Sequence, residues 1–254
     1  MLVDLHTHST FSDGRYTPSQ LVKMAAEAGI GILGITDHDS VNGIEEALNA
    51  AAAVPGAPVI AKGVELGTQV GESSVHILGY NIDIHNKDLL DKIGALGYHI
   101  TVEQCDPKNR AVGRPHVAKA LVKEGYFSSV EEAFDVLLKR GKPGYEPQPK
   151  LSPEESVELL HGAGGLAVLA HPAEIENLPL VNTLLSTIPF DGIEVYHPSA
   201  DEKMQQCFLQ MAEKYNLLVS GGSDFHGVEG RFPEQLGIFK VYAEKVNIIQ
   251  KMLK

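Results

Sequence analysis

Two histidines and a carboxylate stand close to the N-terminus, in the segment LVDLHTHSTFSDG. His6 and His8 follow a short apolar run, and Asp13 comes shortly after them. Because side chains alternate along an extended segment, the imidazoles of His6-x-His8 point to the same side and form a suitable pair of ligands for one metal ion. Asp224-x-His226, near the other end of the chain, has the same spacing. Imidazole and carboxylate together suit Zn²⁺, Mn²⁺ or iron.

Further His, Asp and Glu residues stand at or near the ends of other hydrophobic runs. In parallel α/β folds the C-terminal ends of the strands converge on one face, which is where ligands bind. One histidine of this kind could be a satisfied polar residue near a strand end, but the repetition along the chain favours a shared metal site. The residues concerned are Asp37, His38, Asp39, Glu65, His76, His171 and His197.

Short β-rich runs alternate with helical patterns. Two helices carry clear start signals, a capping residue followed by Pro and then Gln or Glu: Thr17 with Gln20, and Ser152 with Glu155. Strand–helix alternation predicts parallel strands with crossover helices, hence a barrel or a doubly wound sheet. The predicted strands are 2–5, 32–36, 59–64, 75–78, 166–170, 192–196, 217–220 and 237–241.

One stretch departs from this alternation of strands and helices. Residues 83–150 read as helices and turns without a good strand, and they end in the Pro/Gly-rich connector GKPGYEPQPKLSP. The sequence therefore predicts a barrel domain formed by residues 1–82 and 151–254, with a small helical insertion, 83–150, carried on it. A chain of 254 residues is long enough to bury the core of such a domain.

Composition excludes several classes of protein. The net charge of −12 argues against a surface that coats extended duplex nucleic acid. No apolar run approaches the roughly 18 to 20 residues of a membrane span, and the N-terminus lacks the pattern of a secretion signal. Cys105 and Cys207 have no partner spacing, so a reduced, cytoplasmic protein is expected.

The motifs HTHSTFSDG, ITDHD, GVE, HILGY, AHP, IEVYHP and GSDFHG occur in this order. Together they resemble the polymerase-and-histidinol-phosphatase (PHP) family of metal-dependent phosphoesterases, over nearly all of the chain outside the insertion. Within the insertion, GRPHVAKALV resembles the PHP subgroup that acts on nucleotides and short RNA. The resemblance implies a distorted (β/α)₇ TIM-like barrel with a trinuclear metal centre at its C-terminal face, holding up to three Mn, Zn or Fe ions.

The resemblance also implies a ligand set, and every one of its nine positions is intact here. The implied groups are His6, His8 and Asp224 at one ion, Glu65 as a bridge to a second ion held with His76 and His171, and Asp13, His38 and His226 at a third.

Such a centre predicts phosphoester hydrolysis. Three divalent ions and three ligand carboxylates leave a charge of about +3, which attracts phosphate. A hydroxide that bridges two metals is a ready nucleophile, since metal binding lowers the pKa of water from about 15.7 toward 7. The remaining ion can bind a phosphoryl oxygen.

Other residues are candidates for roles around the ions. His197 could contact phosphate or protonate the leaving alkoxide, or it could be structural. Arg114 could clamp phosphate with its planar fork, or be an ordinary surface arginine, and His116 is a further substrate-binding candidate. Asp37 and Asp39 could orient metal-bound imidazoles, although Asp37 could equally cap a strand end.

The leading hypothesis is a hydrolase of nucleoside 3′,5′-bisphosphates or of short 5′-phosphorylated RNA, whose insertion caps the metal face. Histidinol-phosphate phosphatase is the alternative within the same chemistry. A non-catalytic metal-bearing module that docks on another protein is the alternative from a different class. The sequence predicts no oligomeric state.

Overall fold

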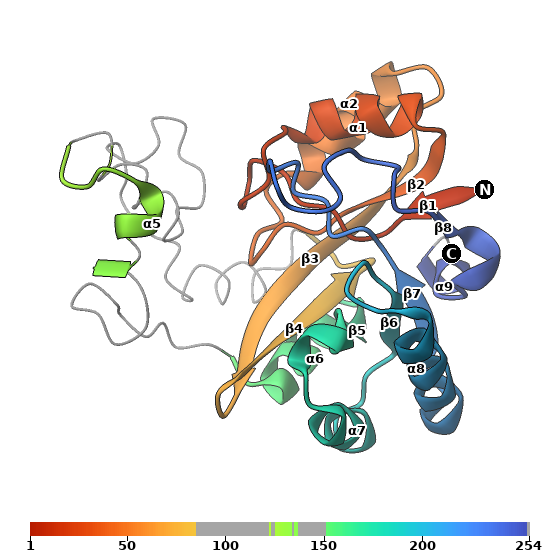
Figure 1. The fold of residues 1–254 in the computed structure, drawn as a ribbon. Coiled ribbons are helices and arrows are strands. Elements are labelled where there is room, and N and C mark those ends of the chain that lie inside the picture. Colours follow the sequence, from red (N-terminus) through yellow and green to blue (C-terminus); the bar gives the residue numbers. More distant parts are fainter. Residues whose placement is uncertain (85–121, 123–124, 134, 137–150, 253–254) are drawn as a thin grey trace.

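The computed structural model describes residues 1–84, 122, 125–133, 135–136 and 151–252. Its strands form one sheet in the order β7-β6-β5-β4-β3-β2-β1-β8, which curls into a nearly closed barrel (Figure 1). The strands are β1 (Leu2–Asp4), β2 (Ile30–Ile35), β3 (Val59–Val70), β4 (Ser73–Tyr80), β5 (Leu166–Leu169), β6 (Gly192–Tyr196), β7 (Leu218–Gly221) and β8 (Val241–Tyr242).

The barrel closes between its first and seventh strands. Just beyond β1, the backbone N–H of Leu5 donates to the carbonyl of Gly221 at 3.3 Å. The next residues of both segments continue this approach through a parallel bridge between Thr7 and Phe225. β8 pairs antiparallel with the other edge of β1 and so lies beside the ring of seven strands. This arrangement confirms the predicted distorted (β/α)₇ barrel.

The expectation of parallel strands was wrong for β8 and for β4. β4 runs antiparallel to both β3 and β5. β3 and β4 are joined by a tight turn at Gly71, whose φ of 59° lies in the left-handed region that glycine adopts without strain. Both strands are longer than predicted, because their polar outer residues continue the ladder up to the turn. The strand expected at 237–241 is reduced to β8, and the positive φ of Gly237 interrupts the extended conformation before it.

Helices cover the outside of the barrel, with α1 and α2 on one side and α6, α7 and α8 on the other (Figure 1). The predicted start signals are confirmed, because Thr17 and Ser152 each form a complete capping box. The helices are α1 (Pro18–Glu27), α2 (Ile44–Ala53), α5 (Val130–Ala133), α6 (Pro153–Gly162), α7 (Leu178–Thr187), α8 (Glu202–Tyr215) and α9 (Ile249–Met252), with two 3₁₀ helices at Pro172–Ile175 and Ala243–Lys245.

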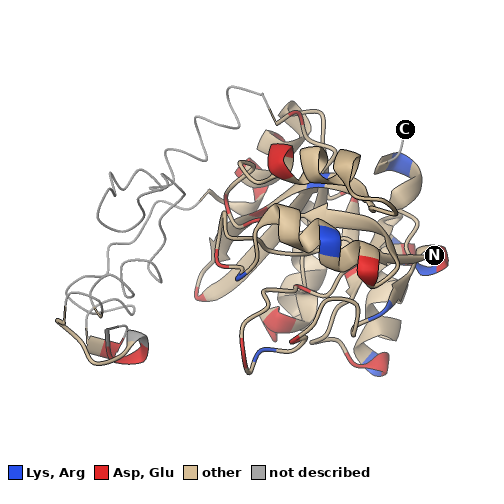
Figure 2. Cartoon of the chain, turned by 90° about the horizontal axis from the view of Figure 1, so that it is seen from above, with Lys and Arg blue, Asp and Glu red and all other residues tan. Residues whose placement is uncertain are grey.

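Many charged residues lie on the outer helices and loops of the barrel (Figure 2). In Figure 2 the blue segments are scattered among red ones rather than gathered into a stripe on the face in view. This distribution agrees with the acidic net charge of the chain. None of the helices that the structure describes is long and apolar enough to cross a bilayer.

The first two strands of the barrel pack too closely to accept an added methyl group at Gly34. A Cβ at this position in β2 would lie 2.1 Å from the carbonyl oxygen of Leu5. We therefore expect Gly34→Ala to lower the free energy of unfolding by about 2 kcal/mol or more, seen as a fall of about 5 °C or more in the melting temperature. Gly162→Ala is the control, since a Cβ there meets no atom within 4 Å. Equal melting temperatures for the two variants would contradict this expectation.

Candidate metal centre

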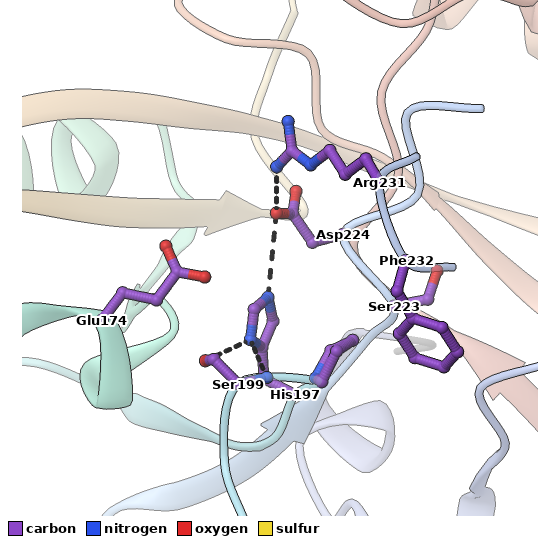
Figure 3. A pocket seen from close by; sticks show the side chains of 8 residues that line it. Glu174, His197, Ser199, Ser223, Asp224, Arg231 and Phe232 are labelled. Carbon is purple, nitrogen blue, oxygen red and sulfur yellow. Dashed lines mark hydrogen bonds and ion pairs between the residues drawn. The ribbon is translucent and has the colours of Figure 1, made fainter. Parts of the chain in front are cut away.

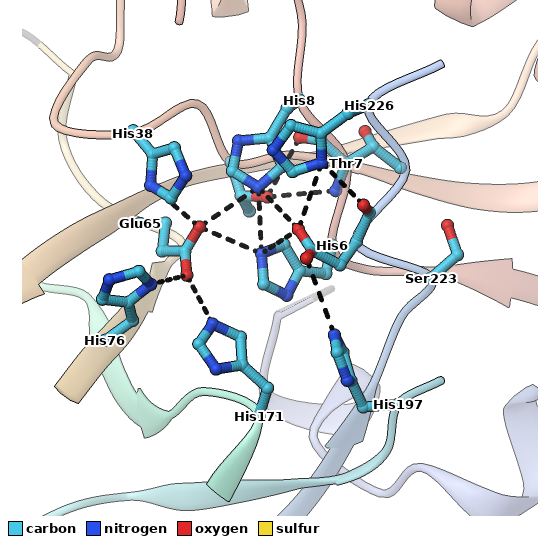
Figure 4. Close-up of polar contacts among 12 residues, drawn as sticks. His6, Thr7, His8, His38, Glu65, His76, His171, His197, Ser223 and His226 are labelled. Atoms are coloured by element: carbon cyan, nitrogen blue, oxygen red, sulfur yellow. Dashed lines mark hydrogen bonds and ion pairs between the residues drawn. The ribbon is translucent and has the colours of Figure 1, made fainter. Parts of the chain in front are cut away.

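Five strands deliver titratable side chains to one end of the barrel. His6 and His8 follow β1, His38 follows β2, and His171 follows β5. The segments after β6 and β7 add the remaining side chains, among them His197, Asp224 and His226. Figure 4 shows the imidazoles arranged around the carboxylate of Glu65. The predicted convergence at the C-terminal strand ends is therefore present in the structure.

Glu65 and His76 reach the same place by a different route. Both lie inside the long strands β3 and β4 rather than at strand ends. β3 extends past the end of β2, and the segment after β2 follows it: the N–H of Glu65 donates to the Asp37 carbonyl at 3.2 Å, and the N–H of Asp39 donates to the Glu65 carbonyl at 2.8 Å. The middle of β3 thus lies level with the ends of its neighbours.

Four donor atoms, one of them Oε2 of Glu65, converge on one point. Nε2 of His6 and Nε2 of His8 are 3.1 Å apart, and they lie 3.2 and 3.1 Å from Glu65 Oε2. Asp224 Oδ1 is 3.4 Å from the first nitrogen and 3.0 Å from the second. Donors bound to one ion at ~2.1 Å are separated by roughly 3.0 to 3.4 Å, depending on the coordination angle. The spacing therefore fits a single first-row metal ion.

The second oxygen of Glu65 faces two other histidines. Glu65 Oε1 is 2.8 Å from His76 Nδ1 and 2.9 Å from His171 Nε2. One carboxylate with a different set of imidazoles on each oxygen has the shape of a bridge between two ions. His38 joins on the first side, with Nδ1 3.1 Å from Glu65 Oε2.

A third group of donors surrounds Asp13. Asp13 Oδ1 is 3.1 Å from His226 Nε2 and 3.9 Å from His38 Nε2. The ring of His8 stacks on that of His226 with centroids 4.0 Å apart. Nδ1 of His8 lies 3.8 Å from Asp13 Oδ1. The nine residues predicted as ligands are therefore brought together in one continuous cluster.

The buried carboxylates of this cluster favour the binding of cations. Burial alone would raise the pKa of Glu65, but the surrounding imidazoles hold it well below its ordinary value, and the same holds for Asp224. Burial would lower the pKa of His8, yet its contacts with Asp224 and Glu65 raise it to about 10. In the protein alone, the buried carboxylates thus raise the pKa of His6, His8 and His171. Divalent ions would supply positive charge and use the imidazole lone pairs, so the residues present fit a metal centre.

The segment after β7 differs from the extended geometry expected for Asp224-x-His226. Asp224 has φ 52°, in the left-handed region, and the Nδ1 atom of His226 lies 2.7 Å from the Asp224 carbonyl. Asp4 holds this turn in place from β1, because its carboxylate accepts hydrogen bonds from the backbone N–H and the hydroxyl of Ser223 at 2.9 and 2.6 Å. Burial raises the pKa of Asp4 to about 6, although these bonds oppose the rise.

Sequence reasoning missed Glu194, which lies inside β6. Its side chain is fully buried, and its Oε1 lies 3.1 Å from His6 Nδ1. Its Oε2 accepts a hydrogen bond from the His171 backbone N–H at 2.8 Å. A carboxylate that accepts the Nδ1 proton of His6 leaves the Nε2 lone pair facing the other donors. An acidic residue within the apolar run GIEVY was the available signal.

Replacing Glu194 by Gln is expected to weaken metal binding by about 10- to 100-fold. The amide group would donate to Nδ1 of His6 as readily as accept from it, which allows the tautomer that blocks Nε2. Competition with a chromophoric chelator measures the affinity. Glu213→Gln makes the same chemical change on the exposed face of α8 and is the control. Unchanged affinity in the Glu194 variant would rule out this role.

The predicted residues that are not metal ligands lie beside the donor cluster or outside the described part of the chain. Asp37 accepts hydrogen bonds from the N–H and hydroxyl of Ser9 and from the hydroxyl of Ser12, each at 2.7 Å. Ser12 in turn lies 3.4 Å from His8 Nδ1, so Asp37 reaches this ring through one intervening group. Asp39 accepts a hydrogen bond from the Gly67 N–H at 3.1 Å and thereby braces β3. Arg114 and His116 lie outside the described residues.

A cavity of about 310 Å³ opens beside Asp224 (Figure 3). His197 and Ser199 line it from the segment after β6, and Arg231 and Phe232 line it from the segment after β7. Arg231 Nη2 contacts Asp224 Oδ2 at 2.7 Å. The spacing of residues 227–239 did not predict a role for Arg231 in the site. The cavity adjoins the donor cluster at Asp224, the one predicted metal ligand among its lining residues.

Comparison with known proteins identifies the family. Residues 4–156 match the PHP domain. The chain is 33% identical to the 3′,5′-nucleoside bisphosphate phosphatase of Chromobacterium violaceum, over 88% of this chain and 87% of that protein. It is 32% identical to the 5′-3′ exoribonuclease Rnm of Escherichia coli, over 89% of this chain and 85% of that protein.

A solved structure supports the same relationship. A Bifidobacterium adolescentis protein assigned as a metal-dependent phosphoesterase superposes with a TM-score of 0.78 at 27% identity, covering 98% of this chain and 94% of its own. The chain therefore belongs to the PHP family, as a metal-dependent phosphoesterase.

Proposed function

We propose that this protein hydrolyses phosphate esters of nucleotides, such as nucleoside 3′,5′-bisphosphates, or short 5′-phosphorylated RNA. The observation that carries the proposal is the convergence of His6, His8, Glu65 and Asp224, whose donor atoms lie 3.0 to 3.4 Å apart at one point. The named activities of the two relatives, on a nucleoside bisphosphate and on RNA, support this class of substrate.

The proposed centre contains up to three divalent ions, drawn from Mn, Zn and Fe. The nitrogen and oxygen donors suit all three metals. When bound, such ions polarise phosphoryl oxygens and activate water for attack on phosphorus. The proposed groups are His6, His8 and Asp224 for one ion, Glu65 with His76 and His171 for the second, and Asp13, His38 and His226 for the third.

His197 is the proposed proton donor to the leaving oxygen. The backbone N–H of Ser199 donates to His197 Nδ1 at 3.1 Å, so the neutral ring carries its proton on Nε2. That atom is buried, and in the part of the chain that the structure describes it has no hydrogen-bond partner; Asp224 Oδ2 lies 3.8 Å away. A proton held at the wall of the cavity is available to an alkoxide as it departs.

The insertion, residues 83–150, is proposed to cap the metal face and to select the substrate. Its candidates are Arg114, as a bidentate phosphate ligand, and His116. A small phosphorylated molecule is the expected partner. The cytoplasm, where such substrates occur, remains the expected compartment.

The decisive assay offers three substrates in parallel to Mn²⁺-loaded protein. They are adenosine 3′,5′-bisphosphate, a short 5′-phosphorylated RNA and histidinol phosphate, and both phosphate and mononucleotide release are measured. Turnover of the nucleotide or the RNA supports the proposal. Asp224→Asn should abolish it, while Asp201→Asn, the same change at the N-cap of α8, should leave turnover intact.

Two results would count against the proposal. Turnover of histidinol phosphate alone would make the protein a histidinol-phosphate phosphatase. No turnover of any of the three substrates, with bound metal verified by elemental analysis, would favour a metal-bearing binding module without catalytic activity.

A further inference from the structure

The cavity beside Asp224 contains one cationic and one aromatic side chain that the donor cluster does not use. Arg231 is 46% exposed, and Phe232, its neighbour in the chain, is 58% exposed. Both line the cavity on the side opposite Glu174 (Figure 3). Large exposed aromatic rings at the mouth of a polar cavity are suited to stacking on a flat ligand.

Arg231 has hydrogen-bond donors to offer a ligand beyond its contact with Asp224. Among the described residues its guanidinium has one recorded contact, with Asp224 Oδ2 at 2.7 Å, and a guanidinium has five N–H donors. The Arg231 side chain is 46% exposed while that of Asp224 is 10% exposed, so the guanidinium can offer its other N–H donors to a ligand on the solvent side. The other oxygen of the carboxylate, Oδ1, already faces His8 at 3.0 Å. Asp224 therefore keeps its inward contact when Arg231 turns toward a ligand.

The charges around the cavity favour an anion at Arg231, in addition to the one expected at the donor cluster. Glu174 and Asp224 are acidic, and Arg231 is the one permanently cationic side chain among the described residues that line it. A phosphate group in the cavity would avoid Glu174 and accept paired hydrogen bonds from the planar guanidinium.

We propose that Arg231 and Phe232 form a subsite for the part of the substrate that does not react. Arg231 binds a second phosphate group, and Phe232 stacks on the nucleobase. This inference rests on the proposed function, since it assumes that the reacting phosphate lies at the donor cluster. Such a subsite favours a substrate that carries two phosphates over one that carries a single phosphate.

The test compares ligands that differ by one group. Adenosine 3′,5′-bisphosphate, AMP and ribose 5-phosphate are offered to the full chain loaded with Mn²⁺ for kinetics. Equilibrium dialysis uses Ca²⁺ in place of Mn²⁺, so that the ligands survive the measurement. We expect Arg231→Gln to weaken binding of the bisphosphate by at least about tenfold relative to AMP. We expect Phe232→Leu to reduce the preference for AMP over ribose 5-phosphate by about fivefold or more.

Arg15→Gln is the matched control. Arg15 is also an exposed arginine near the metal face, but its guanidinium lies over the Tyr16 ring at 5.8 Å. This variant should keep the wild-type preference among the three ligands. It therefore separates a specific contact at Arg231 from a general loss of positive charge.

Two results would overturn the subsite. If Arg231→Gln lowers kcat for all substrates equally and leaves the relative dissociation constants unchanged, Arg231 only positions Asp224. If the wild-type protein binds the bisphosphate no more tightly than AMP, the cavity has no site for a second phosphate. Failure of the proposed function gives a different pattern, in which no nucleotide is turned over while the dissociation constants still report on the subsite.

Discussion

Glu65→Gln will abolish turnover of phosphate esters, lowering kcat/KM by at least about 10³-fold. Glu65 is buried in β3, and its two oxygens contact different sets of histidines at 2.8 to 3.2 Å. The amide has nearly the same shape but no charge and one acceptor in place of two. It cannot bridge two cations, so we expect the bound metal to fall as well, as elemental analysis of the purified variant would show.

Glu72→Gln is the control for this experiment. It makes the same substitution in the exposed turn between β3 and β4, away from every donor group. It should retain both metal and activity. Full activity in the Glu65 variant would show that the bridging role is wrong, and metal retained without activity would assign Glu65 to catalysis alone.

Removing metal is expected to lower the melting temperature by about 10 °C. An ion present at roughly a thousand times its dissociation constant stabilises the folded state by about 4 kcal/mol per site. For a chain of this size each kcal/mol corresponds to about 2–4 °C. Differential scanning calorimetry before and after dialysis against a chelator measures the shift, and added Mn²⁺ should reverse it.

The Glu65→Gln variant also serves as the control for chelation. Because its donor cluster is incomplete, the chelator should change its melting temperature by much less. A wild-type protein that melts at the same temperature with and without chelator would contradict the presence of a metal centre in the purified protein.

The sequence predicted the donor cluster better than its surroundings, for physical reasons. His6 and His8 were recognisable because residues spaced by two share one side of an extended segment. Thr17 and Ser152 were recognisable because a capping box is a local pattern of hydrogen bonds. The antiparallel direction of β4 was not predicted, since strand direction depends on the turn at Gly71 and on partners distant in the chain.

Two residues beside the ligands also escaped prediction. Glu194 occupies a strand position where an acidic side chain commonly faces water, and only the closed barrel places it against His6. Arg231 lies in a segment without periodicity, so its approach to Asp224 depends on the fold of the whole chain. The proposed roles of Arg114 and His116 stay predictions, because these residues lie outside the described part of the chain.

The closure between the first and last strands of the ring has a consequence for the order of events during synthesis. His6 and His8 leave the ribosome well before Asp224 and His226, which follow them by more than 200 residues. N-terminal segments emerge first, and contacts of such long sequence separation form slowly. The complete first donor group, which includes Asp224, can therefore capture its ion only after residues 6–224 have all been translated. A chain that stops short of β7 lacks this donor and is released without a finished site.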